Sequence, residues 1–240
     1  AGTTADTINA AAITEITGTA AEIVAANDNS ELASIDDNFT ATLSGTTGTA
    51  SDISSIDNAT STAVNAATVT SITGTAAELI TIGDADDAGT ILAYTNSAGD
   101  EAYAAVFSGI ADLAQFNAID ADTAGKLDFT DANAYLDLSV NDASDINLAN
   151  LSQADKLTKI DINNSEANTI SNVSAVNLIG VTGGSTTLTI DGDTNDFISF
   201  TESWTKTENT GDGNDTHYTY TSGSETLYTV IDLDGGMSVI

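Results

Sequence analysis

The chain contains no cysteine, no proline and no arginine among its 240 residues. Without cysteine there is no disulfide framework, no thiolate nucleophile and no cysteine-ligated zinc site. Without proline, prolyl isomerisation cannot be a slow folding step. No run of about 18 apolar residues occurs, so the sequence predicts no membrane insertion. A small secreted protein that lacks disulfides usually relies on metal binding or on assembly for its stability.

Basic residues are nearly absent as well. Four lysines stand against 36 acidic residues, which gives a formal net charge of -32. Such a polyanion repels nucleic acids, so we expect no nucleic-acid partner. It also repels itself when it is compact, and bound cations would offset that repulsion. Ca²⁺ suits carboxylate and carbonyl ligands and is the cofactor that we expect, although acidity could serve only to keep the protein soluble in salty water.

Residues for nucleophilic catalysis are scarce. His217 is the single histidine and falls in a segment that alternates as a strand does. No G-x-S-x-G elbow, phosphate-binding loop or dinucleotide fingerprint occurs. We therefore predict that the chain is not an enzyme. A secreted hydrolase that uses a pair of carboxylates stays a distant alternative.

One heptapeptide, T-G-T-A-[AS]-[DE]-[IL], occurs three times, beginning at Thr17, Thr47 and Thr73. The offsets of 30 and 26 residues are in the range of repeat arrays. The glycine breaks the preceding segment, and the second threonine forms a capping box with the acidic residue three positions later, more weakly where that residue is Asp52. Each copy therefore predicts a helix of two to three turns after a short strand. Helices this short are marginal alone, so the copies should stack on a shared core.

The remainder of the chain changes character near residue 155. Before it, Asp100–Leu113 and Asp131–Leu138 read as helices. After it, alternation and β-branched residues predict strands: Lys159–Ile162, Val173–Val181, Thr186–Ile190, Phe197–Phe200, Tyr218–Tyr220 and Thr226–Leu233. The expected fold class is therefore α+β. Residues 1–150 would form an array of short capped helices with short strands, and residues 151–240 an antiparallel β-domain, either a sandwich or a β-roll-like fold.

The best candidate for a metal site is Asp120–Asp131, which follows the spacing of an EF-hand loop. Its candidate ligands stand at loop positions one, three, seven, nine and twelve: Asp120, Asp122, Lys126 through its carbonyl, Asp128 and Asp131. Gly125 stands at the sharp turn. Two departures are Ala124, which supplies no side-chain ligand, and an aspartate in place of the usual final glutamate. The alternative is a solvated acidic turn between helices.

Two other acidic segments are candidate calcium ligands. One is a fragment of the same pattern and the other lies on a turn between predicted strands; their residues are Asp84 and Asp86, then Asp191, Asp193 and Asp196. Clustered carboxylates on a tight turn suit Ca²⁺, but they also suit an ordinary acidic turn. The acidic turns at residues 212–215 and 232–235 are weaker candidates.

The repeated T-G-T-A-[AS]-[DE]-[IL] units resemble the low-complexity repeats of very large secreted proteins from cyanobacteria and other marine bacteria. The segment from Leu188 through Trp204 to Gly223 is similar to a terminal β-module of RTX-like adhesins. The resemblance implies type I-like secretion, calcium-linked folding outside the cell, and a role in a surface layer, a matrix or adhesion. The expected location is therefore extracellular, at the cell surface.

Two functions follow from these expectations. The first is a calcium-dependent structural protein that self-assembles with copies of itself into a filament, sheath or surface layer. Small residues, repeats and abundant threonine favour it, and a strand such as Met237–Ile240 or the N-terminal stretch could pair with the sheet edge of a neighbour. The alternative is a calcium-dependent adhesin module that binds a glycan or a surface.

Overall fold

The computed structural model describes residues 8–30, 32–33, 35, 37–138, 145–164, 166–185, 187–193, 195–209, 216–223, 225–231 and 238–239. The chain folds as two compact units. The first unit is Ala1–Val106 with Ala121–Gly125, and the second is Phe107–Asp120 with Lys126–Ile240. Within the described ranges, no helix has both the length and the apolar character that crossing a membrane requires.

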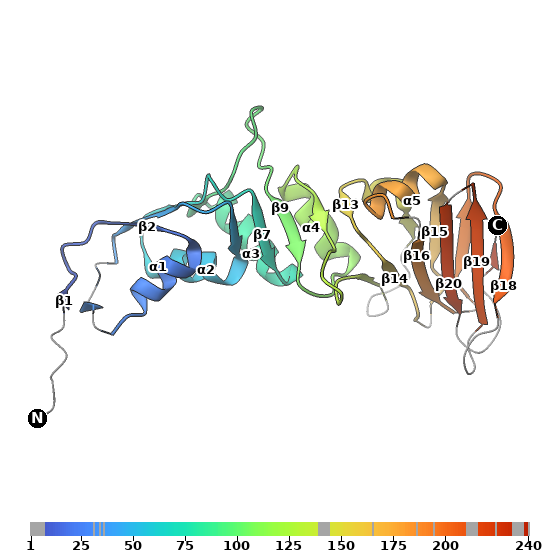
Figure 1. Cartoon of the computed structure of the whole chain (residues 1–240), viewed down its shortest axis with the longest axis horizontal. Helices are drawn as coiled ribbons and strands as arrows, with labels where there is room; N and C mark the ends of the chain where they lie inside the picture. Colours follow the sequence, from blue (N-terminus) through green and yellow to red (C-terminus); the bar gives the residue numbers. More distant parts are fainter. Residues whose placement is uncertain are drawn as a thin grey trace, which may run out of the picture. The chain divides into compact units, whose positions relative to one another are not determined.

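The first unit alternates short strands with helices (Figure 1). Its elements in chain order are β1 (Ile8–Asn9), β2 (Glu15–Gly18), α1 (Ala20–Asn27), β3 (Leu32–Ala33), β4 (Thr40–Leu43), β5 (Thr47–Thr49), α2 (Ala50–Ala59), β6 (Val64–Asn65), β7 (Ser71–Gly74), α3 (Ala76–Asp87), β8 (Ile91–Leu92) and β9 (Ala104–Phe107), whose last residue belongs to the second unit.

The three heptapeptides each lead from a strand into a helix. In the first, Glu22 N–H donates to Thr19 Oγ1 at 3.3 Å while the Glu22 carboxylate accepts from Thr19 N–H at 2.9 Å. Thr75 and Glu78 form the same box at 3.3 and 2.8 Å. At the start of α2 the shorter Asp52 donates its N–H to the cap, and only this half of the box forms. The predicted capping boxes, the weaker second copy and the helix lengths are therefore confirmed.

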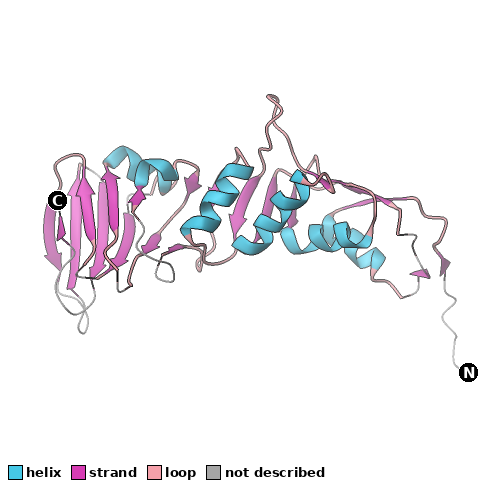
Figure 2. Cartoon of the chain, turned by 180° about the vertical axis from the view of Figure 1, so that it is seen from behind, coloured by secondary structure: helices cyan, strands magenta, loops and turns pink. Residues whose placement is uncertain are grey.

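Strands of the first unit pair in parallel with strands from the next repeat. The orders are β2-β4-β6-β8, β1-β3 and, in another sheet, β5-β7-β9. Helices α1, α2 and α3 lie side by side along these strands (Figure 2). Their buried residues include Ile23, Ile53, Ile56, Leu79 and Ile82. Each short helix is thus held by its neighbours, as the repeat predicts.

The second unit contains most of the β-structure. Its elements are α4 (Leu113–Asp122, whose last two residues belong to the first unit), β10 (Leu127–Asp128), β11 (Leu136–Asp137), β12 (Ile146–Asn147), the 3₁₀ helix η1 (Leu148–Leu151), β13 (Ala154–Asp155), β14 (Lys159–Asp161), β15 (Thr169–Val173), α5 (Ala175–Val181), β16 (Thr187–Gly192), β17 (Phe197–Phe200), β18 (Thr205–Asn209), β19 (Thr216–Ser222), β20 (Glu225–Ile231) and β21 (Ser238–Val239).

Parallel pairing also dominates the second unit. One sheet has the order β11-β14-β16-β20-β19-β18 and another has the order β12-β15-β17-β21, while β10 pairs with β13. Inward-facing residues stack in rows across neighbouring strands: Leu136, Ile160 and Ile190 in the first sheet, and Ile146, Ile170 and Ile198 in the second. All six side chains are buried. These rows set the register, because a shift by one residue would expose every one of them.

The expected α+β class is therefore wrong. The chain is α/β, with four larger, mostly parallel sheets and five α-helices among its described residues. The C-terminal part is not an antiparallel β-domain: among its described strands, antiparallel pairing is confined to β18, β19 and β20. Strands that return at each repeat lie beside their counterparts and point the same way, and this brings their apolar residues into rows.

Three local predictions are also wrong. The segment Asp100–Leu113 contains β9 instead of a helix, and Asp131–Leu138 is a turn followed by β11. The predicted strand Val173–Val181 is mostly α5, because Ser174 caps a helix by accepting from Asn177 N–H at 3.2 Å. Alternation of small and apolar residues over so few positions does not separate helix from strand.

Candidate functional site

The EF-hand-like segment is distributed over several local structures. Asp120 and Asp122 lie in the last turn of α4, Lys126 in the loop before β10, Asp128 in β10, and Asp131 in the turn that follows. Lys126 Nζ donates to the carbonyl oxygen of Ser152 at 3.2 Å. Asp131 Oδ1 accepts from the backbone N–H of Asn133 at 2.8 Å. Asp131 therefore stabilises its own turn, and Lys126 joins its loop to the segment that follows η1.

Gly125 has a role other than the one that an EF-hand gives it. A Cβ at this position would lie 2.0 Å from the carbonyl oxygen of Tyr103. The buried Thr123 hydroxyl, 2.8 Å from the same oxygen, donates to it and accepts from Gly125 N–H at 3.1 Å. Glycine is needed here because two backbone segments touch.

The first unit gathers an acidic cluster that consists of Asp84, Asp86, Asp87, Glu101 and Asp122. Tyr103 Oη donates to Asp122 Oδ2 at 2.5 Å. The Asp122 carboxylate also lies against α3, where a Cβ on Gly83 would come within 2.5 Å of its Cγ. Asp86 Oδ1 accepts from Ala93 N–H at 2.8 Å. Residues from the end of α4, from α3 and from the segment before β9 thus meet at one place.

Proton affinities in the acidic cluster are raised. The pKa of Asp122 is raised above its usual value, mainly by burial. The hydrogen bond from the Tyr103 hydroxyl offsets part of this rise, and the charges of neighbouring aspartates add to it. Burial also raises the pKa of Glu101, and a hydrogen bond with Asp86 adds to the effect. The pKa of Tyr103 is raised well above its usual range, mainly by burial. A cation that bound these groups would therefore displace protons.

The segment Asp191–Asp196 stabilises the connection between β16 and β17. Asp196 is fully buried, and its Oδ1 accepts from the backbone N–H and from the side-chain amide of Asn168, both at 2.9 Å. Its Oδ2 accepts from Asp193 N–H at 2.8 Å. Burial raises the pKa of Asp196 above its usual value, and these hydrogen bonds offset only part of that rise. Asp193 Oδ1 accepts from Asn195 N–H at 2.8 Å.

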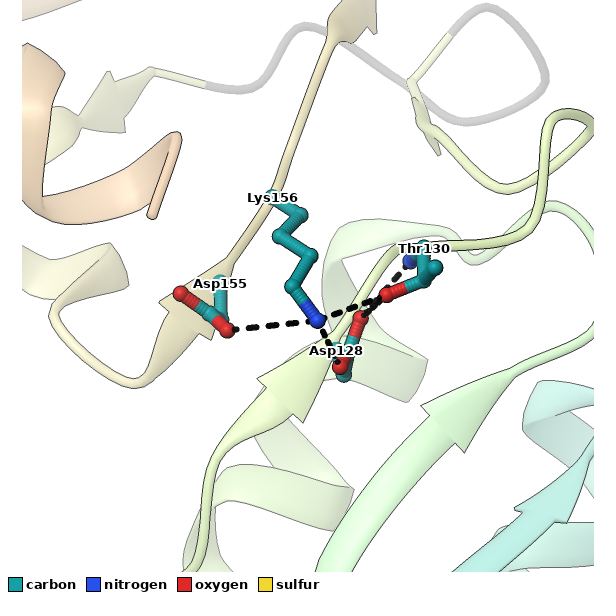
Figure 3. Close-up of polar contacts among 4 residues, drawn as sticks. All are labelled: Asp128, Thr130, Asp155 and Lys156. Carbon is teal, nitrogen blue, oxygen red and sulfur yellow. Dashed lines mark hydrogen bonds and ion pairs between the residues drawn. The ribbon is translucent and has the colours of Figure 1, made fainter. Parts of the chain in front are cut away.

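Two lysines bridge aspartates of neighbouring strands, a feature that sequence reasoning missed. Lys156 Nζ lies 2.7 Å from Asp128 Oδ2 and 3.9 Å from Asp155 Oδ2, and it donates to Thr130 Oγ1 at 2.9 Å (Figure 3). Burial raises the pKa of Asp128, but hydrogen bonds from Lys156 and Thr130 outweigh it and hold the pKa below its usual range. We call this arrangement a lysine bridge.

The second lysine bridge is Lys159, whose Nζ lies 2.8 Å from Asp161 Oδ2 and 2.9 Å from Asp191 Oδ2. In both bridges the paired aspartates occupy opposite positions on adjacent parallel strands. Like charges placed opposite each other destabilise a sheet, and each ammonium offsets such a pair. The adjacent letters D-K at 155–156 and the alternation K-I-D at 159–161 were the available signals.

The described residues show no ready-made grouping of side-chain ligands for a metal ion. Among them, no three carboxylate or histidine side chains are placed to hold a metal ion together. Most of the candidate carboxylates bind lysines, a tyrosine or backbone N–H groups instead. Asp120 Oδ1 is buried with no hydrogen-bond partner in the described ranges, and burial raises the pKa of its carboxyl group. The acidic turns at 212–215 and 232–235 and the His217 side chain lie outside the described residues.

No protein-family model, no curated protein and no solved structure matches the chain.

Proposed function

We propose that this chain is a secreted structural module of a bacterial cell surface that assembles with copies of itself into a filament, sheath or surface layer. The observation that carries the proposal is the open edge of β2. Thr40 N–H donates to Thr14 O at 2.8 Å, and Ser44 N–H donates to Gly18 O at 2.9 Å. Alternate residues of a strand direct their backbone groups to opposite sides. The carbonyl group of Gly18 faces β4, so the N–H and C=O groups of its neighbour Thr17 face the opposite side. No strand of the described residues pairs there.

A second open edge lies in the second unit. Strand β21 pairs in parallel with β17 through Phe197 with Ser238 and Ile198 with Val239, and its other side has no strand partner among the described residues. The edge strand β18 differs, because its sequence T-K-T-E-N carries charges of the kind that prevent edge pairing. We therefore assign the contact to β21 of one copy and β2 of the next. Head-to-tail contacts of this kind produce an open filament unless the rotation between copies closes a ring.

Charge makes this assembly depend on cations. Two copies that each carry a net charge of -32 repel each other strongly at low salt. Calcium ions bound to exposed carboxylates would reduce that repulsion more effectively than sodium at the same ionic strength. In this proposal calcium only reduces the repulsion between copies, so no preformed calcium site is required.

The test measures the mass and shape of the purified chain by light scattering and negative-stain electron microscopy. The solutions contain millimolar calcium, EDTA, or sodium chloride at matched ionic strength. We expect filaments or sheets in calcium and separate chains in EDTA. A chain that stays monomeric in all three solutions would refute the assembly proposal, and equal assembly in sodium chloride would refute its calcium dependence.

A pair of variants locates the contact. Thr17→Pro removes the outward N–H of β2, whereas the control Thr17→Val keeps it. Thr17 is exposed, so both variants should keep the circular dichroism spectrum of the parent. We expect only Thr17→Pro to abolish assembly. Assembly that survives in a folded Thr17→Pro variant would exclude β2 as the contact.

A further inference from the structure

An open groove of about 700 Å³ lies on the outer face of the sheet that contains β11, β14 and β16. The side chains that matter for its chemistry are Ile110, Asn133, Tyr135, Thr158, Lys159 and Thr189. All of them belong to the second unit. The volume is within the range of about 300–1,000 Å³ that is typical of small-molecule sites.

The register of the sheet arranges the side chains of its outer face in two rows. Tyr135, Lys159 and Thr189 occupy equivalent positions on three adjacent strands, because Leu136 pairs with Ile160 and Lys159 pairs with Thr189. Lys159 Nζ lies 4.9 Å from the centroid of the Tyr135 ring. Two positions further along the strands is a row of carboxylates: Asp137, Asp161 and Asp191. An aromatic ring, an ammonium group and a hydroxyl therefore stand beside a line of acceptors.

We infer that this groove binds an uncharged saccharide. A sugar ring presents C–H groups on its faces and hydroxyls around its rim, so it needs a flat apolar surface bordered by donors and acceptors. The Tyr135 ring and Ile110, which is 47% exposed, supply the apolar surface. The amide of Asn133 and the hydroxyls of Thr158 and Thr189 supply polar groups that both donate and accept.

The charge around the groove selects the class of saccharide. One ammonium, that of Lys159, is already shared by Asp161 and Asp191, and Asp137 is the third carboxylate of the row. The local balance is negative, so a sulfated sugar, a uronic acid or a phosphate ester is repelled. A neutral sugar escapes this repulsion and can exchange hydrogen bonds with the polar side chains that line the groove, Asn133, Thr158 and Thr189. Because the groove uses no residue of β2 or β21, the inference goes beyond the proposed assembly and is independent of it.

The test uses the full chain and four soluble probes. Cellobiose, maltose and N,N′-diacetylchitobiose are the neutral disaccharides, and a sulfated heparin disaccharide is the anionic one. Saturation-transfer NMR detects binding and calorimetry measures affinity. We expect at least one neutral disaccharide to bind and the heparin disaccharide not to bind. No binding by any neutral probe, or binding of the anionic probe at equal strength, would overturn the inference.

Three variants locate the site. Tyr135→Ala removes the ring, and Ala132→Trp fills the groove from an exposed position without removing a polar contact. Tyr94→Ala is the matched control, because it removes an aromatic ring from the first unit, which contributes no residue to the groove lining. We expect the first two to weaken binding by roughly tenfold or more and the control to leave it unchanged. Unchanged binding in a folded Ala132→Trp variant would place the ligand elsewhere.

Discussion

Replacing Gly125 by alanine distinguishes two interpretations of the segment from Asp120 to Asp131. In the structure, the new Cβ would lie 2.0 Å from the carbonyl oxygen and 2.5 Å from the carbonyl carbon of Tyr103. Ordinary van der Waals contacts begin at about 3.4 Å, so one backbone must move by roughly 1.4 Å in a closely packed region. Overpacking of this kind costs about 1–3 kcal/mol, and the upper end applies because neither partner is a flexible side chain.

The assay is thermal unfolding followed by circular dichroism, in calcium and in EDTA. A loss of about 3 kcal/mol corresponds to a fall in Tm of about 6–12 °C for a chain of this size. Gly180→Ala is the control. It lies in α5 with nothing within 4 Å of its Cβ position, and alanine favours a helix by about 1 kcal/mol. We expect Gly125→Ala to lower Tm equally in both solutions. An unchanged Tm, or a loss seen only in calcium, would refute the close-approach argument.

Three further predictions concern individual side chains. Asp196→Ala should lower the free energy of unfolding by about 2 kcal/mol, because the backbone N–H groups of Asn168 and Asp193 lose the carboxylate that accepts from them; urea denaturation with an unchanged midpoint would contradict this. Because burial raises the pKa of Asp122 in the folded state, the folded chain binds more protons than the unfolded chain between the ordinary and the raised pKa. This carboxyl should therefore add stability as the pH falls through that window, and Asp122→Asn should be more stable than the parent at neutral pH and flatten the pH profile of Tm. A steeper profile in the variant would reverse the sign that we assign. Thr75→Ala should cost about 1 kcal/mol and Thr49→Ala less, because only the first removes a complete capping box; equal losses in urea titrations would count against this difference.

Features that depend on a few neighbouring residues were predictable from the sequence. Each capping box, at Thr19 and at Thr75, joins two residues that are three positions apart, so the local sequence alone is enough to predict it. The direction of strand pairing was not predictable in this way. Ile160 lies between Leu136 and Ile190, which are distant in the sequence, and an isolated alternating segment does not show whether its neighbour runs parallel or antiparallel.

The segment from Asp100 to Leu113 shows how composition misleads. Its alanines favour a helix by propensity. In the structure, Tyr103, Ala105 and Phe107 alternate along the chain and are all fully buried, which is the period of a strand. The ring of Phe107 then stacks on Phe129 with centroids 4.5 Å apart. The burial of every second residue, including the large Tyr103 and Phe107, outweighed the helical preference of the alanines.

The candidate carboxylates were identifiable as a set, but their partners were not. Asp128 is held by Lys156, which is 28 residues further along the chain, and Asp196 by Asn168, again 28 residues away. Both contacts join segments at the ends of paired parallel strands, β10 with β13 and β15 with β17. Such contacts require the register between strands, which no local pattern contains.

The lysine bridges also affect how the chain resists degradation. Enzymes of the trypsin class cut after lysine or arginine, and this chain offers four lysines and no arginine. The ammonium groups of Lys126, Lys156 and Lys159 are bound to a carbonyl or to carboxylates of neighbouring segments. A protease must draw that ammonium into its own acidic pocket, so it must first break these contacts. Cleavage after these three lysines by proteases of this class should therefore be slow while the chain is folded.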